Sequence, residues 1–457
     1  MSLPKLKRHP LPYFPDSAKL FAPLAGVPWS VFLDSGAPYS QQGRYDILAA
    51  DPICTLVTRG DETEICRDSL VKRSKEDPFL LVKYQLGEQL PTLDDLPFNG
   101  GAIGYFSYDL ARQLEKLPIL AKNTENIPEM AVGIYLWAVI VDHKLQQSWL
   151  VGQDHLSVNW PQLIDQFSVI PAEQEQTDFK VLGEVTANMS QEEYANAFSR
   201  IKHYLREGDC YQVNLTQRFT ADCQGDPWHA YQKLREINAA PFSCYLNIPD
   251  VQVLSSSPER FLKVEQGVVE TKPIKGTRSR KQDFLEDQQQ VKQLQNSDKD
   301  RAENVMIVDL LRNDLSKTCQ PGSVKVPELF AVESYATVHH LVSTITGVLD
   351  AGQHALDLLR SCFPGGSITG APKIRAMEII EELEPDRRGI YCGSIGYVGF
   401  DGTMDTNIAI RTMVHTNEKI HFSAGGGIVY DSVMQDEYQE TFDKVSALLK
   451  LLKQMAG

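Results

Sequence analysis

The chain has 457 residues, of which 42% are hydrophobic and 23% charged, an ordinary composition for a large globular protein. The excess of 60 Asp and Glu residues over 45 Lys and Arg residues gives a net charge of −15, so the surface repels nucleic acid and anionic membranes. The eight cysteines form no Cys-x-x-Cys pair and no apolar run reaches the ~18 residues of a membrane span, so we expect a soluble, cytoplasmic protein with reduced thiols.

The first half of the chain is typical of short strands separated by turns. Strands are expected at residues 31–33 and in the glycine-punctuated segment 100–106. Residues 130–142 (MAVGIYLWAVIVD) form a longer run of branched and aromatic side chains, which predicts a strong strand. Residues 149–151 are expected to pair with this run across a turn.

The composition changes near the middle of the chain. Residues 157–185 are polar and irregular, which indicates a soft boundary near residue 180. We therefore distinguish an N-terminal region, residues 1–180, from a C-terminal region, residues 181–457. The two regions are expected to interleave in one fold.

Strands and helices are interspersed in the second half. One helix is expected to begin after Ser190, which forms a capping box with Glu193, and to end at Gly208. Further helices are predicted at residues 283–315, 356–362, 373–382 and 436–455, and strands at residues 394–400, 407–414 and 420–423. Because strands and helices do not alternate strictly, the pattern predicts an α+β fold built on large, mostly antiparallel sheets.

Two pairs of carboxylates are spaced three residues apart on predicted helices. Asp300 and Glu303 form one pair, and Glu437 and Glu440 form the other. Residues at this spacing share a helix face, so two packed helices could present four oxygen donors, a set that suits Mg²⁺. In an acidic chain such a pair is more often a solvated helix surface, so the spacing alone leaves both interpretations open.

Two glycine-rich segments and two ionisable residues also suggest chemistry. Residues 425–427 are a glycine triplet whose backbone could approach an anion, or could simply form a flexible turn. Residues 365–373 form a glycine-rich loop without the spacing of a Walker loop. Lys275 would be a nucleophile only if its pKa fell well below about 10.4, and Glu259 could be a general acid or an ion-pair partner.

Taken in order, these segments resemble one family, the chorismate-utilising enzymes. The resemblance covers about residues 185 to 450. It rests on the segments 257–261 (SPERF), 271–277 (TKPIKGT), 300–310 (DRAENVMIVDL), 312–314 (RND), 340–343 (HLVS), 366–373 (GSITGAPK), 410–412 (IRT), 424–429 (AGGGIV) and 437–441 (EYQET). It implies an α+β fold of two large antiparallel β-sheets in a sandwich flanked by helices.

The resemblance also implies a role for individual residues. Mg²⁺ would be held by Asp300, Glu303, Glu437 and Glu440, and Asp300 could bind through water because many members carry glutamate there. Chorismate would be bound by Gly276, Thr277, Tyr391, Arg411, Gly425, Gly426, Gly427 and Lys444. The catalytic residues would be Lys275 as nucleophile, Glu259 as the acid that protonates the departing hydroxyl, and His340, which would orient the ring hydroxyl.

Two positions separate the branches of this family. The branches that add water carry a base lysine where this chain has Gln212, and glutamine cannot act as a base, so ammonia is the expected incoming group. Anthranilate synthases read Pro-Ile-Ala-Gly-Thr where this chain carries Lys275. The lysine favours amination at C4, giving 4-amino-4-deoxychorismate for p-aminobenzoate and folate biosynthesis. An anthranilate synthase component I is the alternative.

The same resemblance suggests two further partners. The chain carries no Gly-x-Cys-x-Gly turn, so a separate glutamine amidotransferase subunit is expected to supply ammonia. A tryptophan site is expected at Ser35, Gly43, Arg44, Tyr45, Pro241, Phe242 and Ser243, with an ordinary strand edge and turn as the alternative. For the whole chain, a non-enzymatic tryptophan-binding regulatory subunit is the remaining alternative, although Lys275 and the carboxylate pairs argue against it.

Overall fold

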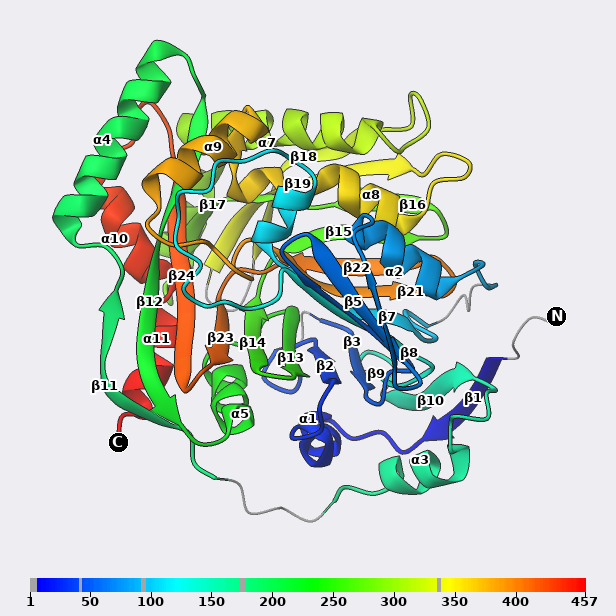
Figure 1. Ribbon diagram of the computed structural model, residues 1–457. Helices are drawn as coiled ribbons and strands as arrows, with labels where there is room; N and C mark the ends of the chain where they lie inside the picture. Colours follow the sequence, from blue (N-terminus) through cyan, green and yellow to red (C-terminus); the bar gives the residue numbers. More distant parts are fainter. Residues whose placement is uncertain (1–5, 41–42, 92–95, 172–176, 335–337) are drawn as a thin grey trace.

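The computed structural model describes residues 6–40, 43–91, 96–171, 177–334 and 338–457. Two large antiparallel sheets form the centre of the molecule, each with twelve strands among these residues, and helices lie around them (Figure 1). This confirms the expected α+β sandwich.

The strands of the two sheets come from the whole length of the chain. The first sheet has the order β1 (Leu6–Leu11), β10 (Gln147–Gln153), β9 (Trp137–Asp142), β3 (Tyr45–Ala49), β2 (Ser30–Asp34), β13 (Phe242–Ile248), β14 (Val251–Ser257), β23 (Thr412–Thr416), β24 (Lys419–Ile428), β12 (Gln212–Gln224) and β11 (Lys180–Ala187), with β20 (Gly370–Ala371) also paired to β12. The second has the order β17 (Ile274–Ser279), β19 (Val338–Val348), β16 (Val268–Thr271), β15 (Arg260–Glu265), β22 (Met404–Ile408), β21 (Ser394–Gly399), β7 (Gly101–Phe106), β8 (Met130–Tyr135), β4 (Cys54–Arg59), β5 (Glu62–Arg67) and β6 (Leu70–Ser74), with β18 (Lys325–Ser334) beside β19. Strands from before and after residue 180 therefore lie in each sheet.

A shared hydrophobic cluster holds the two sheets face to face. Val31, Ile47 and Val253 of the first sheet pack with Ile103 and Ile395 of the second, and all five are at most 2% exposed. Removing this apolar surface from water is the main source of stability at the interface.

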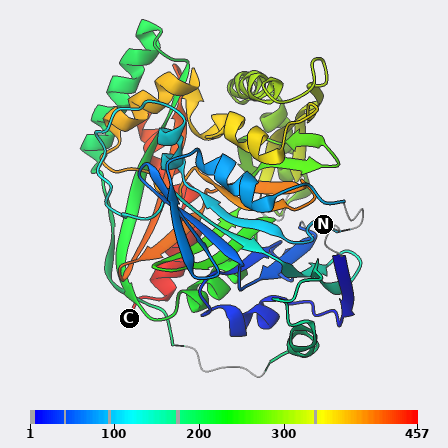
Figure 2. The same cartoon turned by 45° about the vertical axis from the view of Figure 1, so that its right-hand side comes forward.

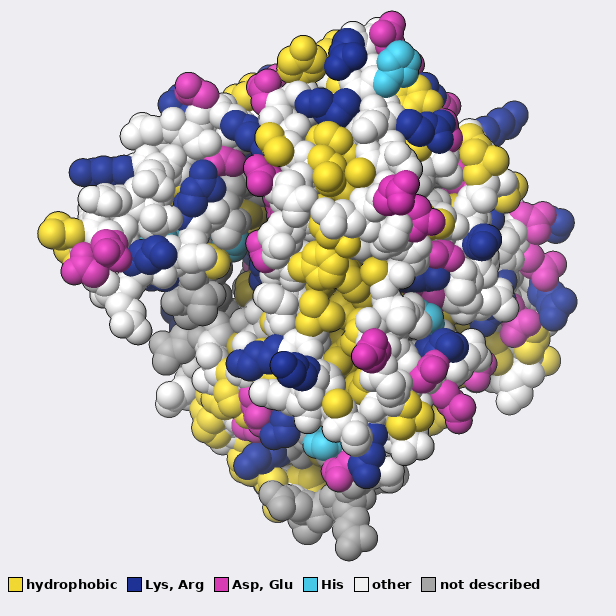
Figure 3. Space-filling view, turned by 90° about the vertical axis from the view of Figure 1, so that its left-hand side faces the viewer, with side chains coloured by type: hydrophobic (Ala, Val, Ile, Leu, Met, Phe, Trp, Pro, Cys, Tyr) yellow, Lys and Arg dark blue, Asp and Glu magenta, His cyan; other side chains and the backbone are white. Residues whose placement is uncertain are grey.

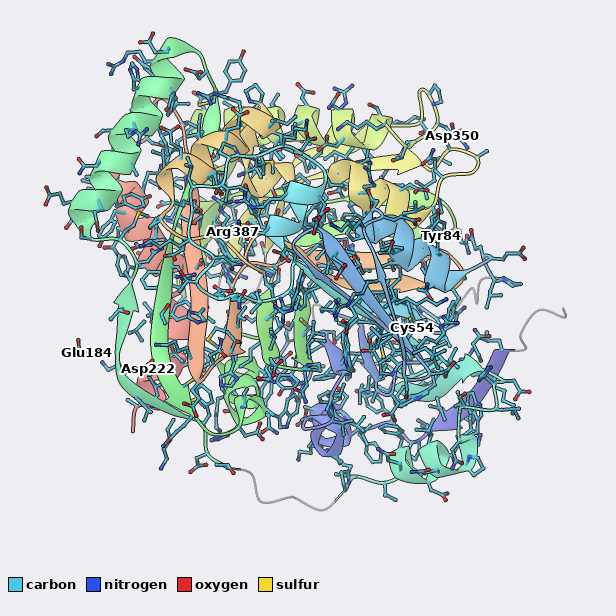
Figure 4. The ribbon with its side chains drawn as sticks, viewed as in Figure 1. Cys54, Tyr84, Glu184, Asp222, Asp350 and Arg387 are labelled. Atoms are coloured by element: carbon cyan, nitrogen blue, oxygen red, sulfur yellow. The ribbon has the colours of Figure 1, made fainter. Side chains whose placement is uncertain are left out.

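All eight cysteines are free thiols, as expected. Cys54, at the start of β4, lies among the strands of the second sheet (Figure 4).

The helices cover the edges and outer faces of the sandwich. They are α1 (Ala18–Phe21), α2 (Pro78–Leu86), α3 (Trp160–Phe167), α4 (Gln191–Glu207), α5 (Pro227–Ile237), α6 (Phe284–Gln295), α7 (Asp298–Ser316), α8 (Ala355–Cys362), α9 (Lys373–Leu383), α10 (Met434–Lys444) and α11 (Ser446–Gln454), with short 3₁₀ turns at Ala22–Leu24, Tyr108–Gln113 and Gly366–Ile368. The helices α7, α8 and α9 lie together on one side, and α1 and α3 lie on the opposite side (Figures 1 and 2). None of the described helices is long and apolar enough to cross a membrane.

On the face that carries α4 and α10, acidic and basic side chains are interspersed around a hydrophobic strip (Figure 3). The helix α4 confirms its predicted boundaries. Ser190 accepts a hydrogen bond from the backbone N–H of Glu193, Glu193 accepts one from the N–H of Ser190, and Gly208 ends the helix at φ +83°.

Two strand predictions were wrong in the same way, because one predicted strand is two strands in different sheets. Residues 130–142 form β8 in the second sheet and β9 in the first, with the change at Leu136. Residues 407–414 are divided between β22 and β23, with the change next to Arg411, whose φ is +50°. In both places the chain turns a corner of the sandwich.

Two helix predictions were also wrong, because each predicted helix is broken once. The segment 283–315 forms α6 and α7, and Ser297 caps the second by accepting a hydrogen bond from the N–H of Asp300. The segment 436–455 forms α10 and α11, which meet at Val445. The glycine triplet does not follow a strand, as was expected, but lies within β24.

Candidate active site

Lys275 and Glu259 meet at one residue of the glycine-rich loop. Lys275, in β17, is partly buried, and its Nζ donates to the backbone oxygen of Ser367 at 3.0 Å. Glu259 lies between β14 and β15, is 6% exposed, and accepts a hydrogen bond from Ser367 Oγ at 3.1 Å. Burial lowers the pKa of Lys275 and raises the pKa of Glu259. These directions favour a neutral amine beside a protonated carboxyl group.

His340 lies on the neighbouring strand, β19. Its Nδ1 is 2.8 Å from Thr277 Oγ1, whereas His339 is directed to Asp287, 3.0 Å away, so the two rings have different surroundings as expected for adjacent strand residues. Burial, and then the positive charge of Arg411, lowers the pKa of His340 to about 4. The ring is therefore neutral at neutral pH and can orient a hydroxyl group without adding charge.

The two predicted carboxylate pairs interact electrostatically, and the pair on α10 lies beside the glycine triplet. Asp300 and Glu303 lie on α7, and Glu437 and Glu440 lie on α10. A Cβ atom on Gly426 would be 3.0 Å from Glu437 Oε2 and 3.4 Å from Glu440 Oε1. The pKa of Glu303 is raised by burial and also by the negative charge of Glu437, so the two carboxylate pairs repel each other.

Gly276 closes this part of the site. Its φ is +79°, and a Cβ atom there would lie 3.0 Å from Asp300 Cγ and 2.9 Å from Leu294 Cδ1. Only glycine combines this backbone conformation with such close packing against α6 and α7.

Cationic side chains neutralise three of the four carboxylates. Arg278 is 3.0 Å from Asp300, Lys299 is 3.6 Å from Glu437, and Lys444 is 2.6 Å from Glu440. Accordingly, the structure places no three acidic, histidine or cysteine side chains in an arrangement ready to hold a metal, within the part of the chain that it describes. The donor set still fits Mg²⁺ chemically because it consists of carboxylate oxygens, and the side chains of Lys299 and Lys444 are 50% and 43% exposed, so both can move away.

Arg411 and Lys444 are the two cations expected to bind an anionic substrate. The guanidinium of Arg411 is partly buried and makes no hydrogen bond or ion pair with the described residues, and burial lowers its pKa. Lys444 donates to the backbone oxygen of Gly425 at 2.9 Å, which brings it to the glycine triplet. A guanidinium that makes no hydrogen bond with the described residues has its donors available for a carboxylate.

The glycine triplet itself allows close strand pairing. A Cβ atom on Gly425 would lie 2.2 Å from the oxygen of Leu215, and one on Gly427 would lie 2.5 Å from Gln212 Nε2. Gln212 is fully buried, and its Nε2 donates to Asn214 Oδ1 at 2.9 Å. The Gln212 amide therefore lies against β24, the strand that Glu437 and Glu440 also approach. An amide cannot act as a base.

Tyr391 differs from the other predicted residues. It is 8% exposed, and burial, then the nearby Cys392, raises its pKa. No other predicted site residue makes a hydrogen bond to it among the described contacts, and its place in the wall of the site stays a prediction.

The seven residues predicted to bind tryptophan line one separate cavity of about 640 Å³. They are Ser35, Gly43, Arg44, Tyr45, Pro241, Phe242 and Ser243. The backbone N–H and the hydroxyl of Ser35 both donate to Asp46 Oδ1 at 2.7 Å, and Arg44 forms an ion pair with Asp142 at 2.7 Å. The cavity lies between the two sheets, because strands of both contribute to its lining, and its volume is in the range of small-molecule sites.

Sequence reasoning missed two residues of the site. Ser367 was within a quoted motif but had no role, although it is the residue that contacts both Lys275 and Glu259. Lys299, which pairs with Glu437, directly precedes Asp300 in the sequence, and a basic residue beside a carboxylate pair was the available signal.

Comparison with known proteins identifies the family. Residues 32–450 match the family described as chorismate binding enzyme. The chain is 50% identical over 448 residues to aminodeoxychorismate synthase component 1 of Salmonella typhimurium, with 97% of both chains covered. It is 36% identical over 446 residues to anthranilate synthase component 1 of Aquifex aeolicus, with 93% of this chain and 89% of that protein covered. The crystal structure of anthranilate synthase component I from Streptococcus pneumoniae matches with a TM-score of 0.78 at 30% identity, with 90% of this chain and 93% of that chain covered. The chain therefore belongs to the family of chorismate binding enzymes.

Proposed function

We propose that the chain is the chorismate-aminating component 1 of an aminodeoxychorismate synthase. It converts chorismate and ammonia into 4-amino-4-deoxychorismate, the precursor of p-aminobenzoate for folate biosynthesis. The observation that carries this proposal is the 50% identity to a named component 1 across 97% of both chains, together with the placement of Lys275 beside Glu259. The designation as a component implies a partner, and a glutamine amidotransferase subunit that supplies ammonia fits this role.

The proposed reaction is a double displacement. The neutral Nζ of Lys275 attacks C2 of the ring while Glu259 protonates the C4 hydroxyl, which leaves as water. Ammonia then attacks C4, and the amine of Lys275 leaves C2. Two allylic shifts place nitrogen where the hydroxyl was and keep the enolpyruvyl group.

Other residues bind and orient the substrate. Arg411 and Lys444, with the backbone of residues 425–427, would bind its carboxylates, and the neutral His340 would orient the ring hydroxyl. Glu303, Glu437 and Glu440 would hold Mg²⁺, with Asp300 as a further or water-mediated ligand. When bound there, Mg²⁺ supplies positive charge that stabilises the ring carboxylate as the electron distribution changes.

Product identity tests the proposal. The purified chain, incubated with chorismate, Mg²⁺ and ammonium, should produce 4-amino-4-deoxychorismate, detected by chromatography and mass spectrometry. Fluorescent anthranilate, formed without an added lyase, would show that the chain is an anthranilate synthase instead. Tight tryptophan binding without any turnover of chorismate would support a regulatory subunit.

We further propose that the 640 Å³ cavity binds L-tryptophan, because it brings together all seven residues expected to contact that ligand. Calorimetric titration should show one site per chain. Ser35→Ala should weaken binding about five- to tenfold, since it removes one hydroxyl from the cavity wall. The control Ser168→Ala removes a hydroxyl at the end of α3 that, among the described residues, donates to the backbone oxygen of Ile164, and it should bind like the parent. An active chain that takes up no tryptophan would contradict this second proposal.

A further inference from the structure

We infer that Ser367 is a positioning residue for both the acid and the nucleophile. Its hydroxyl donates a hydrogen bond to Glu259, and its backbone carbonyl accepts one from Lys275. This inference rests on the proposed amination of chorismate. The two contacts are 3.1 Å and 3.0 Å long, and Ser367 is 8% exposed. A single residue that contacts both reacting side chains can keep their relative positions constant while bonds form and break.

The loop around Ser367 is fixed by close packing and by hydrogen bonds within the loop. A Cβ atom on Gly366 would lie 2.5 Å from Leu310 Cδ2, so the loop packs directly on α7. The hydroxyl of Thr369 donates to the backbone oxygens of Gly365 and Gly366, at 3.1 Å and 3.3 Å. These contacts restrict the backbone on both sides of Ser367, so its hydroxyl and carbonyl are set before substrate binds.

The hydroxyl of Ser367 stabilises the carboxylate that remains after Glu259 has released its proton. Burial is the largest influence on Glu259 and raises its pKa, whereas Lys275 and the donated hydrogen bond from Ser367 oppose that rise. Burial favours the protonated acid, whereas the hydrogen bond from Ser367 favours the carboxylate that forms when the proton is transferred. Ser367 thus lowers the pKa that burial alone would give Glu259, which helps this residue to release its proton.

The carbonyl of Ser367 orients the amine of Lys275. It accepts one N–H of the neutral amine, which leaves the lone pair free to form the bond to C2. The C4–O bond then breaks, and the hydroxyl leaves as water with the proton from Glu259. The nitrogen of Lys275 keeps both of its protons and becomes a secondary ammonium, and the carbonyl still accepts one of them.

The second displacement reverses these changes. Ammonia forms the bond to C4, the bond between C2 and the lysine nitrogen breaks, and its electron pair returns to the nitrogen. Because the lysine nitrogen was never deprotonated, it leaves as a neutral amine. The new ammonium at C4 gives one proton back to Glu259. Each turnover therefore consumes chorismate and ammonia and releases 4-amino-4-deoxychorismate and water.

Ser367→Ala separates the two contacts because it removes the hydroxyl and keeps the carbonyl. The value of kcat should fall about 10- to 100-fold, the range for a hydrogen bond to a charged group. Activity declines as pH rises through the pKa of Glu259, because the acid must be protonated. Loss of the hydrogen bond raises that pKa, so the alkaline limb of kcat/KM should move to higher pH. The covalent adduct on Lys275 should still form and should be visible by intact-mass analysis.

Thr369→Val is the matched control, because the Thr369 hydroxyl donates within the same loop and, among the described residues, makes no hydrogen bond to Glu259 or Lys275. This variant should lose activity modestly and keep the alkaline limb of the parent. Ser367→Cys, which retains a weak donor, should give an intermediate shift and covers the case in which Ser367→Ala folds poorly. An unmoved limb in both Ser367 variants would overturn the inference.

An infrared titration of the carboxyl of Glu259, taken as the difference between the parent and Glu259→Gln, tests the coupling without turnover. The carboxyl should titrate at higher pH when Ser367→Ala is present. Absence of 4-amino-4-deoxychorismate from the parent reaction would reject the proposed function, whatever this titration shows. An unchanged titration in a chain that does form the product would reject the role of Ser367 alone.

Discussion

Replacement of Lys275 by alanine is expected to lower formation of 4-amino-4-deoxychorismate by roughly 10³-fold or more, as for removal of a nucleophile. Any remaining amination should occur at C2. The reason is geometric, because without the amine nothing can occupy C2 while ammonia attacks C4, and direct attack by ammonia at C2 becomes the available route. Chromatography with mass spectrometry separates the two products. Intact-mass analysis with chorismate should show an adduct on the parent chain and none on the variant.

Lys272→Ala provides the control. Lys272 lies three residues before Lys275, but its Nζ pairs with Glu333 at 2.5 Å instead of contacting the glycine-rich loop. This variant should keep both the C4 product and the adduct. If Lys275→Ala made 4-amino-4-deoxychorismate at the parental rate, the lysine would not be the nucleophile, and the discrimination between the two amination sites would have to reside elsewhere.

The corners of the sandwich explain which parts of the fold the sequence could predict. Helix α4 was predicted with its boundaries because its signals are local, namely the capping box of Ser190 and Glu193 and the glycine at 208. The strand at residues 130–142 was predicted as one because its run of branched and aromatic residues is continuous, and the structure buries every residue from Met130 to Asp142. A continuous apolar run has no alternation of exposure that would mark the point where the chain leaves one sheet and enters the other.

Arg411 shows that the same limitation affects the site. It lies at the second such corner, where β22 of one sheet gives way to β23 of the other, and its left-handed backbone is unusual for a residue with a side chain. Sequence pattern placed it inside a strand, and only the family resemblance gave it a role. The corner brings its guanidinium into the electrostatic surroundings of Glu259 and His340, which no spacing rule could have indicated.

Motif order predicted which residues belong together but not how their charges are balanced. The carboxylate pairs were found from their spacing on helices, and the structure places Glu437 and Glu440 beside Gly426 and Asp300 beside Gly276. The lysines that neutralise two of these carboxylates, Lys299 and Lys444, come from the same two helices. Which cation faces which carboxylate depends on rotamers and on the packing of α7 against its neighbours, and this information is not local in sequence.

The largest effect on cofactor binding is expected from Glu437→Gln and Glu440→Gln. Each change removes one negative charge and keeps the shape of the side chain, so the fold should survive while the affinity for Mg²⁺ falls by more than roughly a hundredfold. Glu437 is 4% exposed and is already held by Ser432, whose hydroxyl donates to Oε1 at 2.7 Å, so its variant should lose more than the Glu440 variant. Calorimetric titration with Mg²⁺ measures binding directly, and the activity dependent on Mg²⁺ should fall in parallel.

Asp443→Asn, on the same helix α10, separates a metal site from a general effect of charge. Asp443 is exposed, and its carboxylate accepts a hydrogen bond only from Gln439 among the described contacts, at 2.9 Å. The control removes the same charge from the same helix, so nonspecific attraction of Mg²⁺ to an acidic surface would weaken equally in all three variants. A metal held at the paired carboxylates predicts parental affinity for Asp443→Asn alone. Parental affinity in the two glutamate variants would mean that these residues do not hold the metal and that their lysine partners are their permanent counter-ions.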